Sequence, residues 1–471
     1  MDLLGRLREL VGADTLLTSE QDKAPYLVDH RRLYQGAALA VVQPASTAEI
    51  SRLLHWCNGA GIGVVPQGGN TGYCGGATPD ATGRQIVLSL RRMHAIRSVD
   101  AANYSLVAEA GCTLSAVQAA AADAQRLFPL SLGSEGSCQI GGNLATNAGG
   151  TAVLRYGMMR DLTLGIEVVL ADGSVISTLS PLRKDNTGYD LKGVMIGSEG
   201  TLGVITAACL KLFPQPRSIA TAWISMPDPR AAISLLGRLR DASADRVSSC
   251  ELVPQSALEL VLAHVPGARS PGTAAAPWFL LVELTSSGSD DLDIVLEQVL
   301  AEAIDAGLAL DAAVARSGEQ RENFWRLREN VPEAQRRAGG SLKHDISVPV
   351  SAVPELIERG AALAAQLVPE GFLVAYGHAG DGNLHFNVNQ RPGTDAAAFS
   401  SREPALKRAI HDLVADMGGS FSAEHGIGQL KVGELERYAQ PAELAAMRSI
   451  KAALDPGGIL NPGKVLRGSA L

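Results

Sequence analysis

The sequence predicts an α+β fold, with a mixed α/β arrangement as the alternative for its first half, and the two halves differ in the spacing of their elements. In the first half of the 471 residues, short apolar runs rich in β-branched residues alternate with amphipathic helical patterns. The segment Phe213–Arg217 then breaks the chain, because its two prolines remove two backbone donors and forbid a helix. Beyond it, long helical patterns alternate with strands and a hairpin, which favours an antiparallel sheet covered by helices on one face.

The first-half elements follow from local pattern. A short apolar run occupies 40–43, and strands are expected at 63–65, 86–90, 106–110 and 166–170. A helix is expected at 47–61, because the apolar residues recur at helical spacing and Ser46 or Thr47 can serve as its N-cap. Thr113 opens a second, alanine-rich helix that runs to Ala121.

The second-half elements are longer. Helices are expected at 231–239, 292–306, 351–367 and 441–454, and strands at 221–225, 279–283 and from about Lys343 to Val348. Residues 372–376 and 384–388 form the two arms of the expected hairpin. The stretch 265–277 is rich in Pro, Gly and Ala and is expected to be a loop.

Composition excludes several classes of protein. Lys+Arg 41 against Asp+Glu 49 gives 41 − 49 = −8, and no basic run occurs, which argues against nucleic acid and anionic membrane surfaces as partners. Hydrophobic residues at 46% with charged residues at 19% exclude disorder. The six cysteines show no paired spacing, which is typical of reduced thiols. No stretch is long and apolar enough for a membrane span or a secretory signal, so a cytoplasmic protein is expected.

Glycine, 50 of 471 residues, is enriched and clustered. The three clusters are Pro66–Gly76, Gly133–Gly150 and Gly197–Gly203. Glycine lets the backbone approach a ligand closely, and successive N–H groups can bind an anion, although any single cluster is equally well explained as a tight turn. Three clusters in one region favour a long phosphate-bearing ligand. Neither a G-x-G-x-x-G nor a P-loop motif occurs, which argues against a nicotinamide Rossmann site and a P-loop.

These clusters resemble the flavin domain of the vanillyl-alcohol-oxidase-type FAD proteins. The segments Arg183–Leu191 and Leu460–Lys464 also resemble this family, so the likeness spans almost the whole chain. The resemblance implies a two-subdomain FAD-binding domain over 1–214, an antiparallel-sheet substrate or cap domain with a metal site over 215–430, and a C-terminal segment, 431–471, that returns to the FAD domain. Members with covalently attached flavin carry a His in the first loop, and residues 66–76 contain none, so FAD is expected to bind non-covalently.

The resemblance implies that the first loop holds the pyrophosphate of FAD and that the later loops line the ribityl chain and the isoalloxazine. The residues expected to contact FAD are Pro66, Gly68, Gly69, Asn70, Thr71, Gly72, Gly133, Ser134, Gly136, Ser137, Gly141, Gly142, Asn143, Asn147, Gly149, Gly200, Val204 and Asn461.

A candidate metal site lies in the second half. The segment Gly377–Asn387 carries two histidines around a glycine-rich turn, and Ser422–Gly426 contains Glu-His-Gly. The candidate ligands and base are His378, His385, Glu424 and His425. Two histidines and a carboxylate leave open coordination positions, the form that a catalytic zinc takes, and manganese or iron suits the same donors. The alternative is that these are hydrogen-bonded loop histidines, which the repeated pattern makes less favoured.

A metal beside a flavin suits the oxidation of a 2-hydroxy acid. Hydride leaves the Cα–H most easily from an alkoxide, and zinc lowers the pKa of bound water from 15.7 to ~7, a differential stabilisation of roughly 12 kcal/mol. A histidine of ordinary pKa can then accept the hydroxyl proton near neutral pH. Arg328, on an expected helix, and Lys343, at an expected strand start, are candidate partners for substrate carboxylates, although an isolated cation is more often a solvated surface group.

The second half resembles the metal- and FAD-dependent D-2-hydroxyglutarate dehydrogenases. By that likeness His378, His385 and Glu424 would bind the metal and His425 would be the base. Likewise, Arg328 and Lys343 would hold carboxylates, with Asn387 beside the substrate. D-lactate dehydrogenases and glycolate oxidase subunits share the His-Ala-Gly-Asp-Gly-Asn and Glu-His-Gly parts. One departure is Pro332, which stands where the family commonly has a Thr or Ser near the distal carboxylate.

The leading hypothesis is therefore an FAD- and metal-dependent dehydrogenase that converts D-2-hydroxyglutarate to 2-oxoglutarate. D-lactate, glycolate or D-malate are alternative substrates within the family. A zinc hydrolase whose glycine clusters are only turns predicts a colourless protein, and a flavin-bearing electron relay predicts no substrate of its own. The acceptor is expected to be an electron-transferring flavoprotein, a quinone or a cytochrome, and a homodimer is the commonest oligomer.

Overall fold

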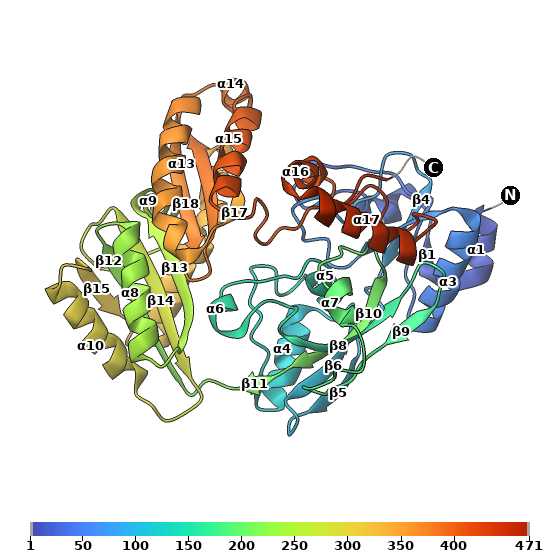
Figure 1. Ribbon diagram of the computed structural model, residues 1–471, viewed down its shortest axis with the longest axis horizontal. Helices are drawn as coiled ribbons and strands as arrows, with labels where there is room; N and C mark the ends of the chain where they lie inside the picture. Colours follow the sequence, from blue (N-terminus) through green and yellow to red (C-terminus); the bar gives the residue numbers. More distant parts are fainter. Residues whose placement is uncertain (1–2, 469–471) are drawn as a thin grey trace. The chain divides into compact units, whose positions relative to one another are not determined.

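The computed structural model describes residues 3–468 and divides the chain into two compact units (Figure 1). We call residues 1–150, 157–215 and 424–471 the terminal unit, and residues 151–156 and 216–423 the central unit. None of the helices in the described part has the length and apolar character that crossing a bilayer requires. All six cysteines are buried, and none of them forms a disulfide in the described part of the chain.

The terminal unit contains two main sheets and a short ladder. The four-stranded sheet has the order β1 (Leu16–Leu17), β2 (Ala40–Val42), β4 (Gln85–Ser89), β3 (Gly63–Gln67), and β2, β4 and β3 are parallel. The five-stranded antiparallel sheet has the order β5 (Ile96–Asp100), β6 (Ser105–Glu109), β10 (Val204–Lys211), β8 (Thr163–Val169), β9 (Val175–Ser177). The ladder pairs β7 (Arg126–Leu127) with β11 (Phe213–Pro214). This pair of sheets confirms the expected mixed architecture of the first half.

The helices of the terminal unit surround these sheets. They are α1 (Leu3–Val11), α2 (Glu20–Lys23), α3 (Thr47–Ala60), α4 (Leu114–Asp123), α5 (Ile140–Ala145), α7 (Leu191–Met195), α16 (Val432–Tyr438) and α17 (Pro441–Leu454), with 3-10 turns η1 (Ala13–Thr15) and η2 (Ala24–Tyr26). The expected N-cap is present, because Ser46 accepts a hydrogen bond from the Glu49 amide at the start of α3. Gly61, with a φ of 64°, caps the other end of that helix. Thr113 caps α4 in the same way.

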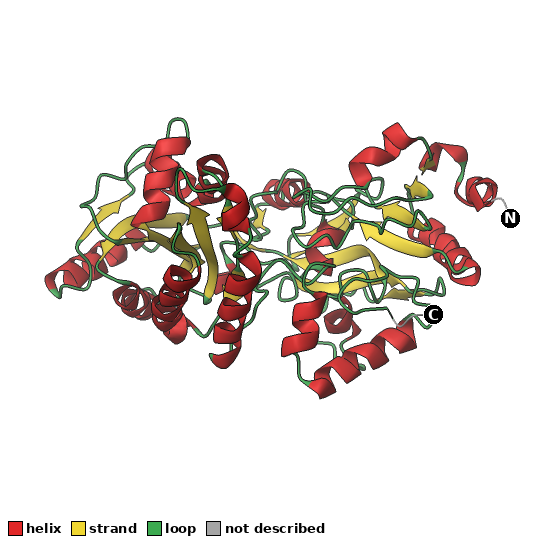
Figure 2. Cartoon of the chain, turned by 90° about the horizontal axis from the view of Figure 1, so that it is seen from above, coloured by secondary structure: helices red, strands yellow, loops and turns green. Residues whose placement is uncertain are grey.

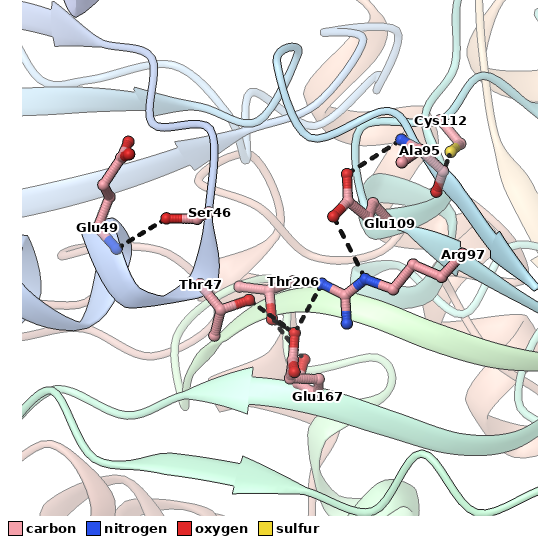
Figure 3. Close-up of polar contacts among 9 residues, drawn as sticks. All are labelled: Ser46, Thr47, Glu49, Ala95, Arg97, Glu109, Cys112, Glu167 and Thr206. Atoms are coloured by element: carbon pink, nitrogen blue, oxygen red, sulfur yellow. Dashed lines mark hydrogen bonds and ion pairs between the residues drawn. The ribbon is translucent and has the colours of Figure 1, made fainter.

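A network around Glu167 ties α3 to the five-stranded sheet (Figure 3). Its carboxylate accepts hydrogen bonds from Thr47 at 2.6 Å, Thr206 at 2.8 Å and Arg97 at 3.1 Å. Arg97 also bonds Glu109 at 3.3 Å, so one cation links strands β5, β6 and β8. Burial alone would raise the pKa of Glu167, but these three donors outweigh it and hold the pKa below its ordinary value.

Replacing Glu167 by Gln should lower the free energy of unfolding of the terminal unit by about 1–3 kcal/mol at pH 7, because charge-assisted hydrogen bonds are lost. A carboxylate whose folded pKa is lowered stabilises the fold above its unfolded pKa, and this contribution disappears as the pH falls through the folded pKa. Urea denaturation measures the free energy of unfolding of the wild type and of the variant, and the difference between these two values should therefore become smaller at acid pH. Glu9→Gln, which breaks an exposed ion pair on α1, serves as the control, and a gap independent of pH would contradict the assignment.

The central unit is built on an eight-stranded sheet. The strand order is β15 (Asp311–Val314), β12 (Ser218–Met226), β14 (Trp278–Ser286), β13 (Val247–Pro254), β18 (Gly371–His378), β19 (Asn383–Gln390), β16 (Ser341–Leu342), and β17 (Asp345–Ser347) also pairs with β19. All the pairings are antiparallel, and β18 and β19 form the expected hairpin. The strand expected from Lys343 is shorter than predicted, because Lys343 lies between β16 and β17.

Helices cover both faces of this sheet, so the prediction of one covered face was wrong (Figure 2). One core packs against α8 (Pro229–Ala242), α10 (Leu292–Asp305), α13 (Val353–Leu367) and α15 (Glu403–Asp416). The other packs against α9 (Gln255–His264), α11 (Gly318–Glu329) and α12 (Val331–Ala338). Polar side chains on these strands do not mark a solvent face, because Thr221, Glu251 and Glu283 are all buried. The remaining elements of the unit are α14 (Ala396–Ser400) and η3 (Val350–Ala352).

A six-residue excursion from the first half completes the central unit. Residues 151–156, which include α6 (Val153–Tyr156), belong to the central unit, although the chain on either side belongs to the terminal unit. Ser249 donates to the Thr151 carbonyl at 2.8 Å, and Arg155 donates to the Thr285 hydroxyl at 2.9 Å. A Cβ at Gly380 would lie 2.9 Å from Leu154, so the hairpin turn packs tightly on this segment.

Candidate functional site

The first and second glycine clusters meet backbone to backbone in the terminal unit. The first cluster follows β3 directly, and a Cβ at Gly69 would overlap the carbonyl oxygen of Ser137 in the second. Asn70 has a φ of 53° and donates to the Val28 carbonyl at 2.9 Å, which fixes the turn of the first loop. The sequence therefore needs glycine at position 69 because a neighbouring backbone occupies the place of its side chain.

Open space lies in front of several other predicted cofactor residues. A Cβ added at Gly72, Gly133, Gly136 or Gly142 meets no atom within 4 Å. In the second cluster, the buried side-chain oxygens of Gln139 and Asn143 have no hydrogen-bond partner among residues 3–468. Open space at these glycines, together with unpaired buried acceptors in the second cluster, fits a long ligand that brings hydroxyl and N–H donors, as FAD does. These residues therefore fit the cofactor that the sequence predicts.

Glu199, in the third glycine cluster, binds the backbone of the two residues Ile427 and Gly428, which follow His425 closely in the chain. The Glu199 carboxylate accepts hydrogen bonds from the amides of Ile427 at 2.7 Å and Gly428 at 2.8 Å. Burial raises the pKa of Glu199 even though these two donors oppose it. The Asn461 amide donates to the Gly76 carbonyl at 2.8 Å and to the Glu199 carbonyl at 2.7 Å. Asn461 thus braces two glycine clusters, and a contact from it to FAD stays a prediction.

His425 lies beside the first glycine loop. Its ring packs edge-on against Tyr73 with 4.7 Å between centroids, and Tyr73 in turn meets His30 at 5.6 Å. The Cys74 carbonyl accepts a hydrogen bond from the Gln429 amide at 3.0 Å, so the chain after His425 is bound to the same loop. The predicted base is therefore held next to a predicted flavin loop within one unit.

In the central unit, β19 turns its apolar side chains to the core that packs against α8, α10, α13 and α15. Its polar side chains point to the other face of the sheet. Leu384, Phe386 and Val388 alternate into that core. The intervening positions are Asn383, His385, Asn387 and Asn389. Register places Tyr376 of β18 and Asp345 of β17 directly opposite His385 on either side. Three adjacent strands thus bring aromatic, imidazole and carboxylate groups to one patch.

Glu251 joins two of the predicted site residues. It stands opposite His378 in the pairing of β13 with β18, and its carboxylate contacts His378 Nδ1 at 2.7 Å. The same carboxylate accepts a hydrogen bond from Arg328 Nε at 2.7 Å. Burial would raise the pKa of Glu251, but the charges of Arg328 and His378 outweigh it and lower the pKa to about 2. An ionised carboxylate at Nδ1 keeps the proton there and leaves Nε2 as the nitrogen that can bind a metal.

The central-unit part of the predicted metal site has suitable donors. The rings of His378 and His385 have centroids 5.8 Å apart. A carboxylate oxygen of Asp345 lies within 4.8 Å of a ring nitrogen of His385, and Asn383 donates to Asp345 at 3.1 Å. An imidazole and a buried carboxylate are donors that suit zinc, manganese or iron, so His385 and Asp345 fit a divalent metal. His378 lies outside the group of mutually close ligand atoms found among the described residues, so its role as a ligand stays a prediction.

The other predicted residues have different surroundings. Asn387 is buried and donates to Gln335 at 3.0 Å, whereas Lys343 is exposed. Arg328 is buried, with its guanidinium 4.9 Å from the Tyr376 ring centroid. Glu424 and His425 begin the last part of the terminal unit. The convergence of these two residues with His378 and His385 stays a prediction.

Glu251 and Asp345 were not predicted from the sequence. Glu251 lies on a strand, β13, whose serines and acid interrupt the apolar pattern, and its partners are far away in the sequence. Asp345 gave a better signal, because it follows Lys343 by two residues in a stretch already singled out. Only the register of β17 against β19 reveals that it faces His385.

Comparisons with known proteins show the family to which the chain belongs. The family model for FAD linked oxidases, C-terminal domain, matches residues 215–465, and that for the FAD binding domain matches 38–179. The chain is 39% identical over 463 residues to the mitochondrial D-2-hydroxyglutarate dehydrogenase of Bos taurus, covering 97% of this chain and 82% of the relative. It is 35% identical over 459 residues to the D-2-hydroxyglutarate dehydrogenase of Xanthomonas citri pv. viticola, covering 98% and 96%.

The solved structure of p-cresol methylhydroxylase with substrate bound has the same fold. It superimposes with a TM-score of 0.76 at 19% identity, covering 98% of this chain and 96% of that one. The predicted vanillyl-alcohol-oxidase-type architecture is confirmed by this likeness. Together with the matching family models and the two dehydrogenase relatives, it shows that the chain belongs to the FAD-linked oxidases, a family of FAD-dependent oxidoreductases.

Proposed function

We propose that the chain is an FAD- and metal-dependent dehydrogenase that oxidises D-2-hydroxyglutarate to 2-oxoglutarate. The observation that carries the proposal is the position of His425 against Tyr73, inside the glycine loop of the segment that matches an FAD binding domain. Similarity to D-2-hydroxyglutarate dehydrogenases over 97% and 98% of the chain supports the choice of substrate. D-lactate, glycolate and D-malate remain the alternatives, because Pro332 offers no hydroxyl to a distal carboxylate.

FAD would be held, without a covalent link, by the glycine loops and the amides of Gln139 and Asn143. When bound, it supplies the acceptor for the hydride that leaves the substrate Cα. A ring nitrogen of His425 accepts the hydroxyl proton, and the edge-on contact with Tyr73 keeps that ring from turning away. Glu199 supports the same ring indirectly, because it fixes the two amides that follow.

A divalent metal would be held by His378, His385 and Glu424, with Asp345 as a fourth candidate donor. When bound, it would lower the pKa of the substrate hydroxyl and hold the adjacent carboxylate. The residue before Glu424 supports its role as a ligand. The Ala423 amide donates to the Asp345 carbonyl at 3.4 Å, and Glu424 follows it in the chain. Arg328 and Lys343 would bind the carboxylates, and Asn387 would lie beside the substrate.

The decisive experiment is anaerobic mixing of the flavin-loaded protein with a panel of 2-hydroxy acids. D-2-Hydroxyglutarate should bleach the flavin absorbance faster than D-lactate, D-malate or glycolate, and L-2-hydroxyglutarate should leave it unchanged. Protein stripped with a chelator should react on the order of 100-fold more slowly, because the hydroxyl keeps its high pKa, and zinc or manganese should restore the rate. A chelator-insensitive rate would contradict the metal role, and a panel without any bleaching would favour an electron relay.

A further inference from the structure

Two buried glutamates on neighbouring strands each hold an arginine of the same helix. Glu283 on β14 accepts hydrogen bonds from Arg321 at 2.7 and 3.0 Å, and Glu251 on β13 accepts one from Arg328 at 2.7 Å. The two arginines are two turns apart on α11, so they lie on one face of that helix. Both pairs therefore attach α11 to the central sheet.

The remaining partners of the two glutamates differ. Glu283 also accepts hydrogen bonds from the Trp325 indole at 2.9 Å and the Thr221 hydroxyl at 3.0 Å, neither of which is a predicted site residue. Glu251 instead contacts Nδ1 of His378, the predicted metal ligand. Its other partner, Arg328, is the predicted carboxylate anchor. Among the described residues, Glu283 thus binds groups of α11 and of the sheet only, whereas Glu251 binds α11 and also a predicted metal ligand.

The contact of Arg328 extends to the second predicted metal ligand. Its guanidinium lies 4.9 Å from the centroid of the Tyr376 ring, and that ring meets His385 with 5.0 Å between centroids. The Glu251 side chain is fully buried, at 0% exposure, so water does not compete for these contacts. The Glu251 carboxylate therefore contacts His378 directly. It is linked to His385 by two further contacts, from Arg328 to Tyr376 and from Tyr376 to His385.

We propose that Glu251 is a positioning residue that orients the metal ligand His378 and the substrate anchor Arg328 together. This inference rests on the proposed function of the site. A carboxylate at Nδ1 sets the tautomer and the ring direction of a metal-binding histidine and raises its basicity. At the same time it fixes the plane of the Arg328 fork, so that metal affinity and substrate-carboxylate affinity depend on one side chain.

The test compares Glu251→Gln with Glu283→Gln in the full-length, FAD-loaded protein. Gln keeps the size of the side chain but removes its charge, and losing such an outer partner weakens a metal site by about 10- to 100-fold. Zn²⁺ is titrated in competition with a chromophoric chelator, and Co²⁺ absorption reports the ligand geometry. We expect Glu251→Gln to raise the Zn²⁺ dissociation constant by about 10- to 100-fold and to alter the Co²⁺ spectrum. Glu283→Gln should change neither, although it loosens the same helix.

A second comparison covers the case in which an unpaired buried Arg328 prevents Glu251→Gln from folding. The double variant Glu251→Gln/Arg328→Gln removes both charges, and Arg328→Gln alone leaves the contact between Glu251 and His378 in place. The double variant should bind Zn²⁺ at least about 10-fold more weakly than Arg328→Gln. Equal affinities, or equal losses in Glu251→Gln and Glu283→Gln, would overturn the proposal. Wild-type protein that binds no Zn²⁺ would instead overturn the proposed metal site itself, and this inference with it.

Discussion

Replacing His425 by Asn should lower the rate constant for flavin reduction by about 10²- to 10⁴-fold while FAD stays bound, because the substrate hydroxyl loses its proton acceptor. Asn keeps a polar planar group of similar reach but does not take up a proton at neutral pH. The variant loses the base and its ring contact with Tyr73, but the backbone hydrogen bond from Gln429 to Cys74 still binds this segment to the loop. Anaerobic stopped-flow absorbance with D-2-hydroxyglutarate measures the rate, and the flavin-to-protein absorbance ratio measures FAD content.

His30 supplies a matched control for this prediction. Its ring also packs edge-on against Tyr73, with 5.6 Å between the two centroids. His30→Asn removes an imidazole from the same aromatic group, and its rate constant should stay within about threefold of wild type, since His30 has no proposed proton role. Unchanged kinetics in His425→Asn would remove His425 from the mechanism, and equal losses in both variants would point to a loop effect.

Replacing Gly142 by Leu should give a folded protein that has lost most of its FAD. A Cβ at this position meets no protein atom within 4 Å, so the larger side chain extends into the space proposed for the cofactor. We expect FAD affinity to fall by 100-fold or more, since about 3 kcal/mol of lost contact suffices for that factor. Calorimetric titration with FAD measures the affinity, and circular dichroism checks the fold.

Gly69→Ala should also lose FAD, but together with stability. Its Cβ would overlap the Ser137 carbonyl, so the two glycine loops would have to separate, at a cost of about 1–3 kcal/mol or more. A lower melting temperature therefore distinguishes it from Gly142→Leu. Gly59→Ala on α3 adds a methyl group in open space away from both loops and should leave FAD content unchanged. Full FAD content in Gly142→Leu would show that the flavin lies elsewhere.

Local signals were sufficient for much of the fold. The helix at 441–454 and the hairpin arms are present as predicted, because capping residues, proline and apolar spacing act over a few residues. The glycine clusters could also be recognised in the sequence, because a backbone that passes close to another backbone excludes residues larger than glycine. β13 was missed because buried serines and Glu251 interrupt its apolar pattern, and only helices on both sides of the sheet explain why they are inside.

The candidate site divides along the same line. His378, His385, Glu424 and His425 stand in short motifs that can be found in the sequence alone. Glu251 and Asp345 acquire their partners through strand register, between segments that are far apart in the chain. No local pattern encodes such a contact, so residues that orient ligands are less predictable than the ligands themselves.

The short excursion at 151–156 limits how this protein could exchange parts with its relatives. A chimera that transplants residues 216–423 as one block would leave behind Thr151, Leu154 and Arg155, which pack on the sheet and on the hairpin turn of that block. The transplanted block would then lack the contacts that residues 151–156 make with it. Recombination of the whole central unit therefore needs crossovers at four points in the gene rather than two.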